Sequence, residues 1–207
     1  MFKRDQIKVA NYAMANADNL ARVLQFVILT IQVPLYRVPQ DTQTAREGGD
    51  DAMGVLYGHK FTAYNACEVN AERHYAMARD IIDHAETARQ CAEDLIAYFA
   101  TEPGFGLAKA GFVAQLIAGV GGCIDSHNIK RFKIDARTFD AHKFKSLKRL
   151  KSRRAMVARY MDVIDAQGGT ERLWDGWCHY VATETMFKSA YRDADHVSEY
   201  HCIALGI

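Results

Sequence analysis

Apolar side chains recur every three or four residues along most of the chain, which is the period of an amphipathic α-helix. The segment 10–33 places five apolar side chains on one helical face: Leu20, Val23, Leu24, Val27 and Ile28. Asn16 or Asp18 is suited to cap the start of this helix, because a short polar side chain accepts a hydrogen bond from a free backbone amide there. The pattern predicts a helix that contributes to the core.

Two further regions show a helical pattern. Residues 63–100 are rich in Ala, Glu and Arg and predict one or two helices. Residues 152–167 predict another helix, and the pair Gly168-Gly169 is expected to end it.

The C-terminal residues 170–205 predict two more helices, with Thr170 and Asp195 as their N-terminal caps. Residues 34–58, by contrast, are polar, with paired glycines and two prolines, and predict a long loop of the kind that is often functional. The sequence has no internal repeat, low-complexity tract or strong strand alternation. We therefore predict an all-α fold, a single helical domain over residues 1–207 with seven to nine helices.

The chain has no hydrophobic stretch long enough to cross a membrane. The best candidate, residues 23–36, is too short and contains Pro34. The first residues, MFKRDQIKV, lack the hydrophobic core of a signal peptide. We expect an intracellular protein without a membrane partner.

The five cysteines predict neither a disulfide framework nor a thiolate metal site, because their number is odd and no two are spaced as CxxC. We expect them to be small buried side chains in a reducing compartment. They are Cys67, Cys91, Cys123, Cys178 and Cys202. His196, His201 and Cys202 also match no closed metal site, so the sequence predicts no metal and no cofactor.

The formal net charge of +1 conceals a strongly basic segment, residues 130–154. It holds eleven Lys or Arg and two Asp, a net charge of +9, so the rest of the chain carries −8. A polarised surface of this kind suits a polyanion and predicts DNA as a partner, with a solvated helix face as the alternative. The side chains expected to contact DNA are Lys130, Arg131, Lys143, Lys145, Lys148 and Arg149.

Aromatic residues in and beyond the basic segment are interpreted as core residues. Phe132, Phe139 and Phe144 are interleaved with the positive charges. Trp174 and Trp177 are three residues apart, which places them on one side of a helix.

The most unusual stretch is residues 103–132, PGFGLAKAGFVAQLIAGVGGCIDSHNIKRF. Pro103 and Gly104 predict a tight turn, and Gly106 permits close approach of another backbone. A helix is expected from Leu107, and the free amides at a helix start suit a phosphate oxygen. We expect Gly104 and Gly106 to contact DNA; a simple link between two helices is the alternative.

A lone carboxylate follows this helix. Asp125 comes directly after the apolar pair Cys123-Ile124 and is followed by Ser126, His127 and Asn128. In isolation, an Asp at such a position is usually a helix cap or a turn former. Its place downstream of the glycine-rich turn favours a functional interpretation.

The pattern PGxGxxxA, a short helix, and then an apolar residue, Asp and His-Asn before Lys-Arg resembles the helix-hairpin-helix DNA glycosylase superfamily, the fold of endonuclease III. The resemblance covers residues 103–132. In that superfamily the hairpin grips a DNA phosphate and the Asp lies in the base pocket. The resemblance implies a glycosylase-like helical domain with Gly104 and Gly106 as hairpin glycines and Asp125 as the active-site carboxylate.

The chain departs from the superfamily pattern at several points. The nucleophilic lysine of the lyase branch lies two residues after the second hairpin glycine, where this chain has Ala108. Lys109 comes one residue later, about 100° further around the helix, so a Schiff-base role is not carried over to it. The four-cysteine iron–sulfur signature is absent, and a Gly-rich segment replaces a short hydrophobic-Thr-Asp pattern early in the chain.

The sequences KAGFVAQL, GCIDSHN and GGTERLWDGWC are similar to phage-encoded glycosylase-fold proteins of thymidine hypermodification. This resemblance implies a transferase that attaches an amino acid or small amine to an activated 5-(phospho)methyl-deoxyuridine in DNA, which protects viral DNA from host restriction. Such an enzyme would act in the host cytoplasm. A monofunctional DNA glycosylase that excises a modified or damaged base is one alternative, and a non-catalytic DNA-binding protein is another.

Either enzyme is expected to flip its target nucleotide into a pocket. Asp125 is then the general base for the incoming amine of a transferase, or it stabilises positive charge on the sugar or activates water in a glycosylase. His127, Asn128 and Gln115 are expected to bind base edges or a leaving phosphate. Lys109 is expected to contact the DNA backbone or that phosphate.

Overall fold

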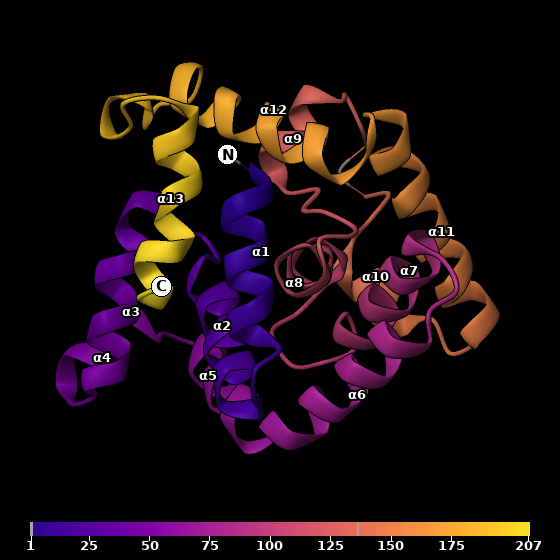
Figure 1. The fold of residues 1–207 in the computed structure, drawn as a ribbon, viewed down its shortest axis with the longest axis horizontal. Helices are drawn as coiled ribbons and strands as arrows, with labels where there is room; N and C mark the ends of the chain where they lie inside the picture. The colour runs from indigo at the N-terminus through magenta and orange to yellow at the C-terminus, as the bar shows by residue number, and fades with distance from the viewer. Residues whose placement is uncertain (1, 136) are drawn as a thin grey trace.

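A computed structural model describes residues 2–135 and 137–207 of the chain. Within these residues all regular structure is helical and no strand occurs, which confirms the all-α prediction. Figure 1 shows the arrangement of the helices. In chain order they are α1 (Phe2–Ala13), α2 (Ala17–Leu29), the 3-10 helix η1 (Leu35–Arg37), α3 (Val38–Glu47), α4 (Asp50–Val55), α5 (His59–Val69), α6 (Ala71–His84), α7 (Ala88–Phe99), α8 (Leu107–Ala118), α9 (Ser126–Arg131), α10 (Ala141–Ser146), α11 (Leu150–Ala166), α12 (Gly169–Thr183), the 3-10 helix η2 (Lys188–Ala190) and α13 (Ala194–Leu205).

Helix α2 lies in the core, as its apolar pattern predicts. All five residues of the predicted face are fully buried. Asn16 caps the helix, since its side-chain oxygen accepts a hydrogen bond from the amide of Asn19 at 2.8 Å. Helix α2 packs against α1, α5, α6 and α8, so it connects the N-terminal helices with the middle of the molecule.

Helix α8 passes through the centre of the molecule, where Figure 1 shows it end-on. It packs against α1, α2 and α7. Nine of its twelve residues are buried, so this short helix is enclosed on almost every side. One glycine-rich turn lies before it and another follows it, and its placement therefore decides where both turns lie.

The prediction of a long loop over residues 34–58 is wrong. The structure has η1, α3 and α4 in this region. Val38, Thr42 and Ala45 are buried along one side of α3, and the polar or small character of two of them hides the helical period in the sequence. The paired glycines Gly48 and Gly49 adopt positive φ angles and separate α3 from α4.

The helices are more numerous than the seven to nine predicted, with thirteen α-helices among the described residues. Residues 63–100 contain parts of three helices, α5, α6 and α7, rather than one or two. Asn70 ends α5 and precedes α6, and Thr87 caps α7 by accepting a hydrogen bond from the Gln90 amide at 3.0 Å. Short polar residues therefore divide a region whose composition favours helix throughout.

The two predicted caps near the C-terminus are also wrong. Helix α12 begins at Gly169 with Gly168 as its N-cap, so Thr170 lies inside the helix and does not cap it. Asp193, and not Asp195, caps α13, because its side chain accepts a hydrogen bond from the His196 amide at 2.8 Å. The end of α11 before the left-handed Gly168 agrees with the prediction.

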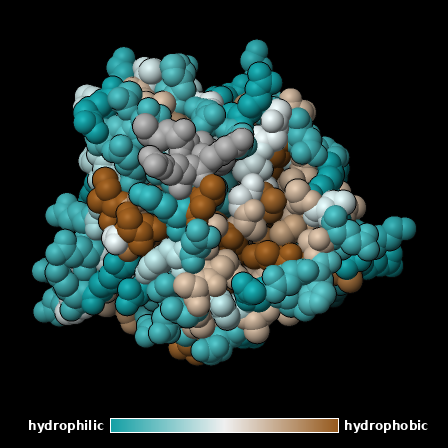
Figure 2. Space-filling model, in the orientation of Figure 1, coloured by the Kyte–Doolittle hydropathy of each residue, from teal (hydrophilic) through white to brown (hydrophobic). Residues whose placement is uncertain are grey.

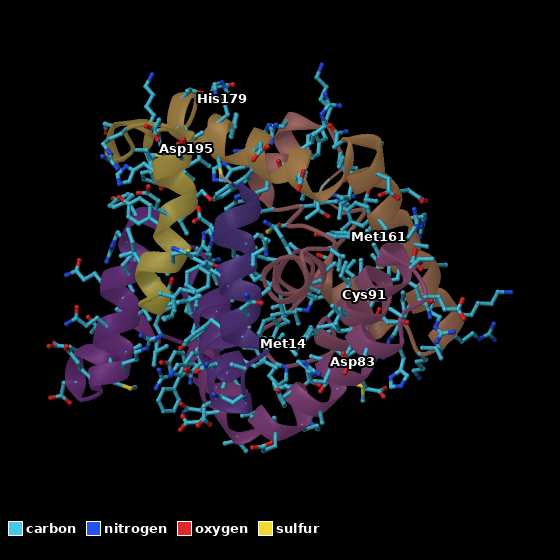
Figure 3. The ribbon with its side chains drawn as sticks, in the orientation of Figure 1. Met14, Asp83, Cys91, Met161, His179 and Asp195 are labelled. Atoms are coloured by element: carbon cyan, nitrogen blue, oxygen red, sulfur yellow. The ribbon has the colours of Figure 1, made fainter. Side chains whose placement is uncertain are left out.

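One hydrophobic cluster extends through most of the helices. Cys91 of α7 and Met161 of α11 are two of its buried members, and they mark in Figure 3 where these helices lie side by side. The face shown in Figure 2 is mostly hydrophilic, and its apolar side chains gather in a few areas near the middle. No helix in the described part of the chain is long and apolar enough to cross a membrane.

Candidate functional site

A cavity of about 500 Å³, called the pocket here, lies between α8, α12 and the segments that follow α2 and precede α9. Its lining comes from residues 30–35, one side of α8, residues 123–128, α12 and residues 185–191. Five residues predicted from the sequence as site residues line it: Lys109, Gln115, Asp125, His127 and Asn128. Aromatic residues from α8 (Phe112) and from later in the chain (Trp174, Trp177, Phe187 and Tyr191) complete it.

Asp125 accepts a hydrogen bond on each carboxylate oxygen. Oδ1 accepts from the backbone amide of Asn128 at 2.9 Å, which caps α9. Oδ2 accepts from Nε1 of Trp177 at 2.9 Å. The capping role considered as an alternative is therefore present, but the carboxylate also borders the pocket. The two donors fix the direction of the carboxylate relative to α12.

The turn that carries Asp125 is anchored on α11 and α8. The hydroxyl of Tyr160 donates to the carbonyl oxygen of Gly122 and accepts from the amide of Ile124, both at 2.8 Å. The same carbonyl lies against Gly111, where a Cβ atom would collide with it. Burial raises the pKa of the Tyr160 phenol well above its ordinary value, so the phenol remains neutral and keeps its proton for the Gly122 carbonyl.

Lys109 lines the pocket in spite of its offset from the lysine position of the superfamily. Its Nζ donates to the hydroxyl of Thr30 at 2.7 Å, and that hydroxyl donates to the carbonyl of Val27 at 2.7 Å. Lys109 and Asp125 both act on the thiol of Cys123. Burial raises the pKa of Cys123 to about 12, and Asp125 contributes to the rise while Lys109 opposes it. The pocket therefore holds an ammonium and a carboxylate near the same thiol.

Gln115 supplies an unused hydrogen-bond donor. The residue is 1% exposed, and its side-chain Nε2 is buried without a partner among the described residues. Its backbone carbonyl accepts a hydrogen bond from the side chain of Gln6. Because buried polar groups in native proteins are nearly always paired, an unpaired amide beside a cavity indicates a place for a ligand acceptor.

The side chains of Asn128 and His127 make different kinds of contact. The amide of Asn128 donates to the carbonyl of Cys123 at 2.7 Å and accepts from Arg131 at 2.6 Å, so it holds the turn together. Its Nδ2 has a second hydrogen and its Oδ1 a second lone pair, so the predicted contact of Asn128 with a base edge or a leaving phosphate stays a prediction. The ring of His127 packs against that of Tyr180, with centroids 5.8 Å apart, and lines the pocket.

Stacked aromatic rings form one wall of the pocket. Trp174 and Trp177 stack with centroids 5.0 Å apart and an interplanar angle of 15°. Trp174 stacks in turn on Phe112 of α8 at 5.9 Å and 23°. The core role predicted for the tryptophans fits the burial of Trp174, but both rings also line the pocket. Flat apolar walls of this kind accommodate a planar ligand.

The hairpin glycines pack against neighbouring helices and do not line the pocket. Gly104 has φ +77°, and a Cβ atom there would collide with Ala63 and Ile28. A Cβ atom on Gly106 would lie 2.7 Å from that of Ala141 in α10. Both glycines thus have a packing role, and their predicted contact with DNA stays a prediction. The contact with Ala141 also brings the basic segment beside the start of α8.

Most of the basic segment is exposed. Its exposed predicted DNA contacts are Lys130, Lys143, Lys145, Lys148 and Arg149. Arg131 is different, because its guanidinium binds Asn128 and lies over the rings of Phe132 and Tyr180 at 5.2 and 5.6 Å. Lys145 donates to the carbonyl of Glu102 at 3.0 Å, the residue directly before the hairpin.

The aromatic residues of the basic segment belong to the core, as predicted. Phe144 is fully buried, and Phe132 and Phe139 are partly buried against the main cluster. The lysines and arginines of this segment therefore lie at the surface, while its phenylalanines pack against the core.

Among the described residues, the remaining histidine and cysteine side chains form no recognisable metal centre. All five cysteines are unpaired thiols. Over residues 2–135 and 137–207, no three His, Cys, Asp or Glu side chains are placed to hold a metal ion. His201 is fully buried beside the ring of Trp174, and burial lowers the pKa of His201 to about 4.

Comparisons with known proteins do not assign this site. The chain matches no protein-family profile, no curated protein and no solved structure.

Proposed function

We propose that this protein is an enzyme that modifies a base in DNA, and that the pocket receives the base after it is flipped from the helix. One observation carries the proposal: Asp125, Lys109, Gln115 and His127 surround a cavity whose wall is a stack of tryptophan rings. A flipped base needs flat apolar surfaces for its faces and polar groups for its edges. The pocket offers both.

The charge distribution supports DNA as the partner. The basic segment packs against the start of α8 through Ala141, and Lys109 on the same helix end lines the pocket. A strand bound along the exposed lysines would therefore run close to the pocket mouth. The turn before α8, the helix and the carboxylate after it support a helix-hairpin-helix glycosylase-like assignment for this all-α fold.

Lys109 favours a transferase over a glycosylase. Cleavage of the bond between base and sugar develops positive charge on the sugar, and an ammonium in the same pocket opposes that charge. A leaving phosphate develops negative charge, which the ammonium stabilises. Lys109 is held by the neutral hydroxyl of Thr30, so its positive charge remains available to an anion.

The substrate that fits this chemistry is a deoxyuridine with a phosphorylated methyl group at position 5, and the co-substrate is an amino acid or another small amine. The amine nitrogen bonds to the methylene carbon while the carbon–oxygen bond to phosphate breaks. The electron pair of that bond leaves with the phosphate toward Lys109, and the proton of the amine passes to Asp125. The motifs resemble those of phage-encoded proteins, so such an enzyme would modify phage DNA inside the host and protect that DNA from restriction.

The experiment is mass spectrometry of nucleosides after the protein is incubated with DNA that contains 5-phosphomethyluracil and a mixture of amino acids and polyamines. The expected product is a new nucleoside that carries the amine in place of the phosphate and forms only when the amine is present. Abasic sites would establish the glycosylase instead, and DNA binding without any new nucleoside would establish a non-catalytic DNA-binding protein.

A pair of matched variants tests the role of the carboxylate. Asp125→Asn keeps an acceptor for the cap of α9 but removes the base, and the product should fall to background. Asp140→Asn is the control, because Asp140 caps α10 in the same way, accepting from the Lys143 amide at 2.8 Å, and does not line the pocket. Equal activity in the Asp125→Asn protein would reject the assigned mechanism.

A further inference from the structure

The side of α8 that faces the pocket is a stripe of three residues with different chemistry. Lys109, Phe112 and Gln115 follow one another at intervals of three, and all three line the pocket. Lys109 is partly exposed, whereas Gln115 is 1% exposed. Along this stripe the helix therefore runs from an ammonium near solvent, past an aromatic ring, to a buried amide.

The buried amide has a free donor at the inner end of the stripe. Nε2 of Gln115 has no partner among the described residues, and the pocket that Gln115 lines is also lined by the apolar side chains of Phe112, Leu173 and Val181. A ligand atom that accepts a hydrogen bond satisfies this amide, and a ligand atom that donates one leaves both donors unpaired.

We infer that Gln115 determines which base the pocket accepts, by donating its amide hydrogen to the carbonyl oxygen at position 4 of a uracil or thymine ring. This inference rests on the proposed function. A flipped pyrimidine is attached to the sugar through N1, so position 2 stays near the mouth and position 4 reaches furthest inward. At position 4 uracil and thymine carry a carbonyl, whereas cytosine carries an amino group that would face Nε2 of Gln115 donor to donor in the amide orientation that the structure shows.

The tryptophans provide a direct assay. The chain has two tryptophans, and both line the pocket, so quenching of intrinsic fluorescence reports occupation of this site. The probes are two otherwise identical short DNA duplexes, one with a single bulged uracil and one with a single bulged cytosine. A bulged base has no pairing partner, so little free energy is needed to flip it, and the two duplexes differ mainly in how the base fits the pocket.

For the wild-type protein we expect quenching by the uracil duplex at a concentration at least about tenfold lower than by the cytosine duplex, since a buried unpaired donor discriminates strongly between such bases. Gln115→Met keeps the length of the side chain and should reduce the preference to less than about twofold. Gln115→Glu replaces the donor with an acceptor and should shift the preference toward cytosine. Gln25→Met is the matched control, because Gln25 is a buried glutamine of α2 outside the pocket.

The outcomes separate this inference from the proposed function. Equal quenching by the uracil and cytosine duplexes in the wild-type protein, or an unchanged preference in Gln115→Met, would overturn the assignment of Gln115 while leaving a base-binding pocket. Absence of quenching by both duplexes, with DNA binding measured independently by anisotropy, would overturn the base-binding pocket itself. Thermal unfolding of each variant confirms that it is folded before titration.

Discussion

The indole nitrogen of Trp177 lies 2.9 Å from Oδ2 of Asp125, a hydrogen bond between residues 52 positions apart in the sequence. It connects the turn before α9 with the middle of α12. Because Oδ1 of the same carboxylate is held by the Asn128 amide, the two bonds together set the direction in which Asp125 faces the pocket.

We expect Trp177→Phe to lower the rate of base modification by about ten- to a hundredfold, because a hydrogen bond to a charged group contributes about 1.5–3 kcal/mol. The phenyl ring keeps a stack on Trp174 but has no N–H group. Trp174→Phe is the matched control, since its indole donates to Ser198 and not to Asp125. Initial rates are measured by nucleoside mass spectrometry. Equal rates in the two variants would show that Trp177 contributes through ring stacking and not through its hydrogen bond to Asp125.

Tyr160→Phe should destabilise the fold and also reduce activity. The change leaves the Gly122 carbonyl and the Ile124 amide without their shared partner, and we expect a loss of about 2 kcal/mol in the free energy of unfolding. Urea unfolding followed by circular dichroism measures this loss. Tyr75→Phe removes a single hydrogen bond, to the Met14 carbonyl, and should cost less. A Tyr160→Phe protein as stable as the wild type would contradict the anchoring role.

Charge reversal of Lys143, Lys148 and Arg149 should weaken DNA binding and lower its dependence on salt. Each lost phosphate contact reduces the slope of log affinity against log salt by about 0.9. Anisotropy of a labelled duplex at several salt concentrations measures this slope. Arg46→Glu is the control, because Arg46 is exposed on α3 and lies outside the basic segment. The same slope in the triple variant and the control would place the DNA elsewhere.

His201 makes stability depend on pH. Its pKa is about 4 in the folded protein and 6.5 ordinarily, so below pH 6.5 the unfolded chain takes up a proton that the folded protein does not. The free energy of unfolding should therefore fall as the pH drops from about 6.5 to about 4, by at most about 3 kcal/mol for this residue. Urea unfolding at pH 7.0, 5.5 and 4.5 measures the fall.

The variant His201→Phe should flatten this dependence, while His142→Asn, which changes an exposed histidine, should leave it as in the wild type. His74 contributes in the same direction in both proteins, because burial also lowers its pKa. An unaltered pH dependence in His201→Phe would assign the effect to other groups.

The sequence was sufficient for features that rest on local patterns. The buried face of α2 follows from apolar spacing, and its cap from the chemistry of Asn16. Helix α3 was missed because Thr42 and Ala45 on its buried side are polar or small. The pattern around Asp125 led to a residue that lines the pocket, but the bond from Trp177 depends on how α12 packs, which no local pattern contains. The same is true of the Lys109–Thr30 bond, which needs the end of α2 beside α8.

Gly176 of α12 restricts which amino-acid substitutions the protein can accept at this position. A Cβ atom at that position would lie 2.6 Å from a guanidinium nitrogen of Arg131, so the arginine rests on the bare backbone of the helix. Any larger residue at position 176 must shift the guanidinium of Arg131, which also donates a hydrogen bond to the side chain of Asn128. Homologous chains should therefore exchange positions 131 and 176 together or retain both.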